Sequence, residues 1–356
     1  MRDMLKKMNK NTKNNLITYG IVIAAFIIMQ TLISTGSISS LMEGLMVPLC
    51  IYIILAVSLN LVVGILGELS LGHAGFMCVG AFTSAFFSKC MRDVITIAPL
   101  RFILALLIGM AVAAVFGIII GIPVLRLKGD YLAIVTLAFG EIIKNLVNVL
   151  FIGKDSNGFH FSTKDVMDLN MEADGTVLVN GPQGITGTPK DSTFLIGVIL
   201  ILITLFIVIN MINSRDGRAI MAIRDNRIAA ESVGINVTKY KLMAFTVSAA
   251  LAGAAGVLYA HNLSTLTANT NNFGYNMSIN ILVFVVLGGI GSIRGSMIAA
   301  AILTLLPELL RGLSDYRMLI YAIVLILMML FNWSPKAIEW REKYLSFGKK
   351  KKEAVK

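Results

Sequence analysis

Long apolar stretches separated by short polar segments run through nearly the whole chain. A helix of about 18 or more apolar residues crosses the roughly 30 Å hydrocarbon layer of a membrane. The stretches are apolar on every side, as in residues 196–209, and do not alternate as membrane β-strands do. The pattern predicts ten membrane-spanning helices, at 16–34, 46–66, 72–88, 101–122, 131–151, 194–212, 242–260, 278–290, 296–311 and 318–333.

Two glycine-rich interruptions divide this helical pattern. The first, at 64–75, separates the second and third helices, and the second, at 288–295, separates the eighth and ninth. Because the eighth and ninth helices are short, residues 279–310 form either two crossings or one crossing and a re-entrant segment. We therefore expect an all-α, polytopic membrane bundle of about ten transmembrane helices, with short or broken helices near 64–75 and 288–295.

Composition supports a membrane protein. Hydrophobic residues make up 56% of the chain and charged residues 14%, with a mean hydropathy of +0.81, whereas about 25% of an average soluble domain is charged. Three cysteines, an odd number, do not indicate a disulfide framework. The first apolar run, 16–33, resembles a signal peptide but exceeds the usual core of about 7 to 15 residues, which favours a retained helix.

The basic residues predict the orientation, because cytoplasmic loops carry an excess of Lys and Arg. With the amino terminus inside, 22 of the 31 Lys and Arg residues fall in cytoplasmic segments and eight in external loops. Both termini are therefore expected in the cytoplasm. The net charge of +11 then reflects topology and attraction to anionic lipid rather than nucleic-acid binding.

A single transmembrane permease domain, 1–356, accounts for the whole pattern. We expect four segments outside the membrane: a cytoplasmic tail at 1–15, an acidic external loop at 152–193, a cytoplasmic loop at 213–241 and a basic cytoplasmic tail at 334–356.

The sequence offers little for an enzyme. Gly153-Lys154-Asp155 lacks the first glycine and the hydroxyl residue of a phosphate-binding loop, so we expect no ATP hydrolysis by this chain. His73, His160 and His261 have no metal-like spacing, and no Ser/His/Asp set is apparent. We expect no catalytic residue, no metal site and no cofactor bound by this chain.

Small residues recur at every fourth position in the fourth and seventh predicted helices. Such spacing lets helix backbones approach closely within a membrane, so we interpret it as packing. The residues are Gly109, Ala113, Gly117 and Gly121, and Ala249, Ala252, Gly253 and Gly256.

The first interruption is a candidate part of a translocation path. A polar break exposes backbone N–H groups and a helix amino terminus at membrane depth, where they can face an anionic group. The alternative is a tight cytoplasmic turn whose glycines serve packing. The candidate residues are Glu68, Ser70, Gly72 and His73.

A polar face on the fifth helix is a second candidate. Glu141, Lys144, Asn145 and Asn148 follow the spacing i, i+3, i+4 and i+7. Ionisable groups at membrane depth are costly and normally face a partner or a water-filled path. The alternative is a self-satisfied Glu141–Lys144 pair without a transport role.

The loop 214–241 is the largest internal cytoplasmic segment. Its stretch 217–227 (GRAIMAIRDNR) has helical composition and basic residues, so a short helix there can present a rigid surface to a soluble partner. The alternative is a connector that is basic only because it lies inside. The candidate residues for contact with such a partner, and for coupling its movement to the membrane helices, are Arg218, Arg224, Arg227, Ala229, Ala230 and Gly234.

Ala229-Ala230, followed after three residues by Gly234, resembles the E-A-A-x-x-x-G loop through which ABC importer permeases engage their ATPases; Ile228 stands where that motif has Glu. More specifically, the chain resembles the permease family of branched-chain amino-acid ABC importers and, within it, the LivM-type subunit. The matching segments occur in order at 59–81, 125–142 (LRLKGDYLAIVTLAFGEI), 181–189, 217–260 and 287–295 (LGGIGSIRG).

This resemblance implies a permease subunit of an ATP-driven importer in the bacterial plasma (inner) membrane, carrying leucine, isoleucine or valine. It implies four kinds of partner: a second, LivH-type permease, two cytoplasmic ATPases that use ATP and Mg, an extracytoplasmic substrate-binding protein and membrane lipid. The alternative is a cation-coupled secondary transporter, for which Glu141, Lys144 and Glu308 would form the ion relay. Such a carrier does not need the 213–241 loop.

Overall fold

The computed structural model describes residues 10–310, except 38, 93, 128, 173 and 174, together with scattered positions between 316 and 330. Residues 1–9, the basic tail 334–356 and much of the predicted helix 318–333 lie outside the described residues.

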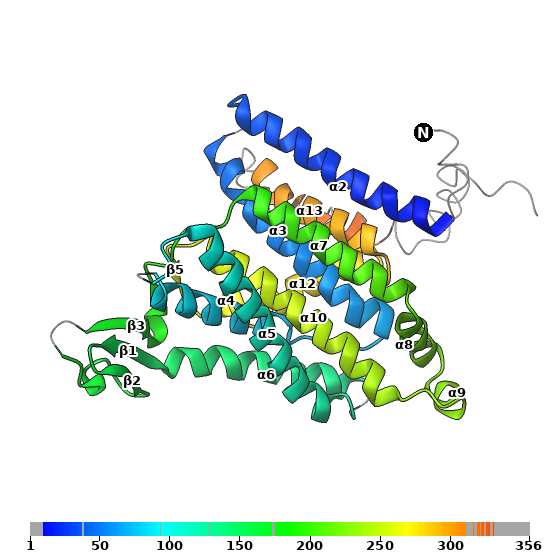
Figure 1. Ribbon diagram of the computed structural model, residues 1–356. Helices are drawn as coiled ribbons and strands as arrows, with labels where there is room; N and C mark the ends of the chain where they lie inside the picture. Colours follow the sequence, from blue (N-terminus) through cyan, green and yellow to red (C-terminus); the bar gives the residue numbers. More distant parts are fainter. Residues whose placement is uncertain are drawn as a thin grey trace, which may run out of the picture.

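Helices form most of the described chain (Figure 1). The membrane bundle consists of α2 (Lys10–Ser34), α3 (Ser40–Asn60), the π-helical turn η1 (Leu61–Leu66), α4 (His73–Cys90), α5 (Ala98–Val124), α6 (Asp130–Val149), α7 (Phe194–Asn213), α10 (Val237–Ala260), α12 (Tyr275–Gly288) and α13 (Ile293–Leu309). Shorter helices are α8 (Arg215–Asp225), α9 (Arg227–Ser232), α11 (Thr270–Phe273), η2 (Met167–Leu169) and η3 (Gly181–Gln183).

Among the described residues, six helical segments are long and apolar enough to cross a membrane: 15–34, 40–66, 98–124, 131–149, 194–213 and 237–260. The prediction of a polytopic helical membrane protein is therefore confirmed, whereas the number of ten crossings stays a prediction. The remaining bundle helices α4, α12 and α13 are outside this set, and each of them flanks one of the two predicted interruptions.

The first interruption is a break that turns back into the bundle. After η1 the chain runs without helix over 67–72, starting at Gly67, whose φ of 80° lies in the left-handed region that favours glycine. The ring Nε2 of His73, the first residue of α4, lies 2.8 Å from Oγ of Ser58. Because Ser58 is eight residues before the end of η1, the segment retraces about 12 Å, and α4 begins inside the bundle.

The second interruption is a tight turn between α12 and α13, two helices that pack against each other. Gly289 and Gly291 adopt φ values of 94° and 82°, which a residue with a side chain rarely adopts. At its other end α12 begins beside the middle of α6, where the backbone N–H of Tyr275 donates to Oε1 of Glu141 at 2.9 Å. The structure thus contains two helices, α4 and α12, whose amino termini lie within the bundle.

Helix α10 is the centre of the bundle and packs against α5, α4 and α3. The small residues Gly109, Ala113, Gly117 and Gly121 are all buried on one face of α5. A Cβ added at Gly80 would overlap the backbone of Gly253 in α10. The packing interpretation of these small residues is therefore confirmed.

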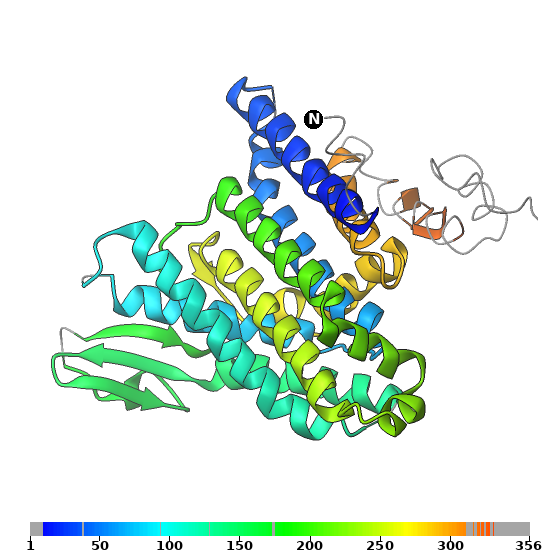
Figure 2. The same ribbon diagram turned by 45° about the vertical axis from the view of Figure 1, so that its right-hand side comes forward.

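The predicted external loop contains a small sheet that the all-α prediction missed. Strands β1 (Phe151–Asp155), β2 (Gly158–Ser162) and β3 (Thr176–Asn180) form an antiparallel sheet in the order β2-β1-β3, and β4 (Ile185–Thr186) pairs with β5 (Thr265–Leu266). At most five residues long, these strands give little alternation in the sequence. Figures 1 and 2 show the three-stranded sheet projecting from one end of the bundle and α8–α9 at the opposite end.

The β1–β2 turn is built around Asp155, whose Oδ1 accepts the backbone N–H of Asn157 at 2.9 Å and of Gly158 at 3.1 Å. Its Oδ2 lies 2.9 Å from Nε2 of His160. Desolvation by itself raises the pKa of Asp155, but these hydrogen bonds and the nearby His160 outweigh it and hold the pKa below its usual value. The carboxylate therefore stays ionised and orders the turn.

Candidate functional site

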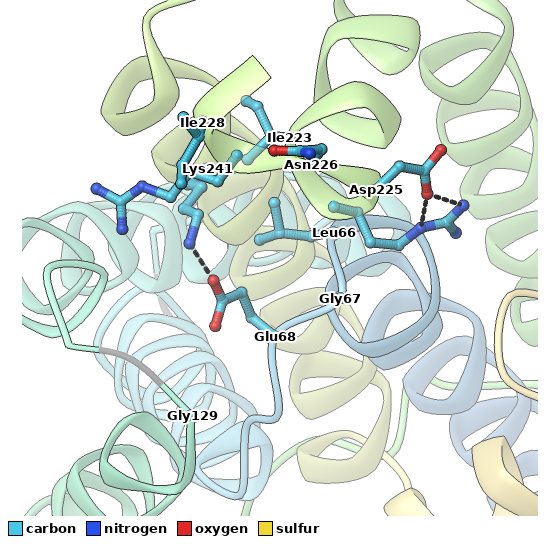
Figure 3. Close-up of a pocket in the computed structure, with 11 residues that line it drawn as sticks. Leu66, Gly67, Glu68, Gly129, Ile223, Asp225, Asn226, Ile228 and Lys241 are labelled. Carbon is cyan, nitrogen blue, oxygen red and sulfur yellow. Dashed lines mark hydrogen bonds and ion pairs between the residues drawn. The ribbon is translucent and has the colours of Figure 1, made fainter. Parts of the chain in front are cut away.

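A cavity of about 430 Å³ lies at the α8–α9 end of the bundle, where three parts of the chain meet (Figure 3). The break after η1 supplies one wall, the α8–α9 segment a second, and Gly129 together with the first turns of α10 the rest. The cavity therefore brings together candidate residues that lie more than 150 positions apart in the sequence: Glu68 with Arg224 and Arg227. Lys241, which sequence reasoning missed, lines the same cavity.

An ion pair between Glu68 and Lys241 crosses this cavity (Figure 3). The two side chains are only 14% and 6% exposed. Glu68 belongs to the break and Lys241 to α10, so the pair ties the retracing segment to the central helix. Breaking a pair of this kind costs more than forming it contributes, because the remaining charge is left buried.

Arg224 provides a second link, from α8 to η1. Its Nη1 donates to the backbone carbonyl of Gly64 at 2.9 Å, and its Nε and Nη2 donate to Oδ1 of Asp225 at 3.0 Å. A Cβ added at Gly67 would contact the Arg224 side chain. The α8 segment is therefore in direct contact with the backbone of the broken helix.

Capping residues fix the shape of the α8–α9 segment. Oγ of Ser214 accepts the N–H of Gly217 at 3.0 Å at the start of α8, and Oδ1 of Asn226 accepts the N–H of Ala229 at 3.1 Å at the start of α9. Gly234 follows α9 with a φ of 84°, which allows the chain to turn toward α10.

The two alanines of the Ala-Ala-x-x-x-Gly motif have different environments. Ala229 is exposed, whereas Ala230 is buried with Ile223 and Val237 in a small core between α8, α9 and α10. Ala230, a candidate residue of the coupling loop, is therefore not available for a surface contact, and its small size serves packing within the segment. Its effect on coupling stays a prediction.

The exposed apolar residues of this segment are Ile228 and Val233, at 80% and 75% exposure. Sequence analysis noted Ile228 only as a departure from the motif and did not single out Val233. Arg218 donates to the carbonyl of Asn213 at 3.1 Å, and Arg227 pairs with Glu231 at 3.1 Å, so both make local contacts.

Further into the bundle, the break is held by side chains from other helices. Oγ1 of Thr136 accepts the N–H of Leu71 at 3.0 Å, and Gly72 packs so closely on the Thr136 backbone that a Cβ would overlap it. Ser70 is buried, and its hydroxyl has no hydrogen-bond partner in the described part of the chain. Ser70, Gly72 and His73 are thus buried inside the bundle, and their part in a translocation path stays a prediction.

The polar face of α6 binds the segment that precedes α12. Glu141 forms an ion pair with Lys144, whose Nζ donates to Oγ1 of Thr270 at 3.2 Å. Asn148 donates to the carbonyl of Ala268 at 2.8 Å. Asn145 differs, because it is exposed on the outer side of α6.

Sequence reasoning missed several buried polar residues that join the helices, among them Ser58 and Asn60 in α3. The available signal was a serine and an asparagine inside an otherwise apolar run, at 49–66. Within a membrane such residues generally form hydrogen bonds across helices.

Residues 41–331 match the family model described as branched-chain amino acid transport system / permease component. This chain belongs to that permease family. It is 37% identical over 298 residues to the high-affinity branched-chain amino acid transport system permease protein LivM of Escherichia coli K12, an alignment that covers 81% of this chain and 67% of that protein. LivM of Salmonella typhimurium is 36% identical, in an alignment that covers the same 81% of this chain and 67% of that protein.

Two further relatives are more distant. The permease protein LivH of Salmonella typhimurium is 24% identical over 78% of this chain and 88% of its own length, and the ribose import permease protein RbsC of Escherichia coli K12 is 28% identical over 78% and 81%. No solved structure matches the chain.

Membership of this permease family makes the chain a multi-pass transport component and not an enzyme. It also favours the ATP-driven reading over the cation-coupled alternative.

In this permease we expect Lys241→Met to lower the free energy of unfolding by up to about 3 kcal/mol, because Glu68 is left charged and largely buried. The double variant Glu68→Leu/Lys241→Met should recover much of the loss, since no charge then remains unpaired. Thermal unfolding of the purified protein measures both. The exposed pair Arg227–Glu231 is the matched control, for which Arg227→Ala should cost less than about 1 kcal/mol. Equal destabilisation in the single and double variants would contradict the ion-pair account.

Proposed function

We propose that this permease is one of two membrane subunits of an importer for leucine, isoleucine and valine. Its similarity to LivM supports the cargo, and its weaker similarity to LivH supports a partner permease of that type. We further propose two cytoplasmic ATPases, which bind ATP and Mg, and an extracytoplasmic binding protein that delivers the amino acid.

In the proposed orientation the α8–α9 end faces the cytoplasm, together with both termini, and the three-stranded sheet faces outward. The 22 to 8 distribution of Lys and Arg supports this orientation. The two ends also differ in structure: one carries a β-sheet with polar turns and the other a pair of capped helices, α8 and α9, with four arginines between them. The binding protein would then dock at the sheet end.

The observation that carries the ATPase interface is the exposure of Ile228 and Val233 on a short, rigid segment. Apolar side chains that protrude from a charged surface are typical anchors of protein–protein contacts. Caps at Ser214 and Asn226 and the core around Ala230 hold these anchors in place, so little conformational entropy would be lost on binding.

Movement of the α8–α9 segment would reach the membrane through Arg224 and Lys241. The first residue holds the carbonyl of Gly64 and the second holds Glu68, so both contact the retracing break. The break leads directly into α4, whose amino terminus lies inside the bundle. Alternating access then requires that ATP-bound ATPases contact the two states of this unit unequally.

The outer face of α6 would line the path between the two permeases. Its exposed residues are apolar except for Asn145, which lies in one stripe with Ile142 and Leu146. An amide facing lipid at this depth would be unfavourable, whereas a path or a partner helix can satisfy it.

Single cysteines test the orientation. Met167→Cys in the sheet region should react with a membrane-impermeant thiol reagent in intact cells, because Met167 is 87% exposed. Ile228→Cys, at 80% exposure on α9, is the matched control and should react only after lysis, in cells that express the permease without its ATPases. The three native cysteines are buried and should contribute little background. Reaction of Ile228→Cys in intact cells would show that the orientation is the reverse of the proposed one.

The interface is tested by retention of the ATPases on the purified permease. We expect Ile228→Ser/Val233→Ser to lower retention at least about tenfold, since truncating an anchor commonly costs more than 1 kcal/mol. Val94→Ser, at a site 73% exposed in the α4–α5 loop at the sheet end, should leave retention unchanged. Retention at the parental level in the double variant would show that α8–α9 is not the ATPase site.

Leucine, isoleucine and valine, but not ribose, should stimulate hydrolysis in the reconstituted importer.

A further inference from the structure

Asn60 occupies the junction between α3 and η1 and is only 1% exposed. Its side chain reaches across to the turn between α12 and α13. Oδ1 accepts the backbone N–H of Gly291 at 2.9 Å, and Nδ2 donates to Oγ of Ser296 at 2.8 Å. One carboxamide therefore binds both the turn and the first turn of α13, which an apolar residue of similar size could not do.

The backbones at this junction are also in close contact. A Cβ added at Gly64 would overlap the backbone of Gly291, and Gly288 packs equally closely on Gly295. The carbonyl of Gly64 also accepts the hydrogen bond from Arg224 of α8. The η1 turn is thus held both by α8 and by the α12–α13 turn.

The far end of α12 contacts the inner parts of the path. Oγ of Ser278 accepts the N–H of Ala74 at 3.1 Å, in the first turn of α4, and the N–H of Tyr275 donates to Glu141 of α6. A shift of α12 along its axis would therefore act on α4 and α6 together. These contacts do not involve the Glu68–Lys241 pair, which links α10 to the break before α4.

We propose that Asn60 is a positioning residue for transport: its carboxamide makes the α12–α13 turn follow η1, so that movement of α8 reaches α12 as well as α4. This inference rests on the proposed ATPase interface at α8–α9. Two features make Asn60 suited to the task. Its two bonds fix both sides of the turn, and its site at the start of a π-helical turn is where helices commonly carry a functional distortion.

The test uses the complete importer in liposomes, with leucine and the binding protein, and measures leucine uptake per ATP hydrolysed. Asn60→Ala should retain the ATPases and basal hydrolysis while the uptake ratio falls about fivefold, because a coupling contact is lost. Ser296→Ala, which removes one of the two bonds, should lower the ratio less. Ser84→Ala is the control, since among the described residues that buried hydroxyl donates only to the carbonyl of Ala81 in its own helix.

The double variant Asn60→Ala/Arg224→Ala identifies the route. If both residues act through η1, the ratio of leucine uptake to ATP hydrolysis in the double variant should be no lower than in the more impaired single variant. A parental uptake ratio in Asn60→Ala, or a double variant whose loss is the product of the two single losses, would overturn the proposal. Should Asn60→Ala fail to assemble, a parental ratio in Ser296→Ala would overturn it. Failure of the ATPase interface itself would show differently, as undiminished ATPase retention in Ile228→Ser/Val233→Ser.

Discussion

The need to satisfy backbone hydrogen bonds inside a membrane governs this structure. No water is present in the hydrocarbon layer, so every residue that leaves a helix there requires a protein partner for its N–H and C=O groups. The break at 67–72 and the turn at 289–292 both create such groups. Arg224 binds the carbonyl of Gly64, Thr136 the N–H of Leu71, and Asn60 the N–H of Gly291. Each partner comes from a different helix, so the breaks join α8, α6 and α3 to the elements that they interrupt.

The same requirement explains how a contact at the α8–α9 end of the bundle can act on distant helices. A continuous helix pairs its own backbone N–H and C=O groups and can shift independently of its neighbours. A broken helix depends on its neighbours for some of these hydrogen bonds. Displacement of α8 must therefore either carry the break along or leave buried polar groups without partners, which is costly. The Glu68–Lys241 pair adds a charge to this constraint. In the proposed mechanism the closely packed helices α5 and α10 form the fixed body against which the broken elements move.

Sequence patterns predicted much of this architecture. The lengths of the apolar stretches identified the long helices, and clusters of glycines located both breaks. Glycines gather there because the backbone adopts a positive φ or closely approaches another segment. The partners of the break were not predictable, since Thr136, Asn60 and Ser278 are single polar residues whose pairing depends on tertiary packing. The burial of Ala230 was hidden for the same reason: composition shows a small residue but not which side of a short helix it occupies.

An engineered disulfide tests most directly whether α8 and the break move as one unit. A Cβ at Gly67 lies 3.5 Å from the Cβ of Arg224, within the range of about 3.5–4.5 Å that a disulfide spans. In Gly67→Cys/Arg224→Cys the hydrogen bond to Gly64 is lost, and a side chain is placed at a residue with a left-handed φ of 80°. For both reasons uptake by the reduced importer should be low. Oxidation replaces that hydrogen bond with a covalent link and should restore leucine uptake. Uptake that stays at the reduced level or falls further on oxidation would show that the two elements must separate during transport, and would contradict the account.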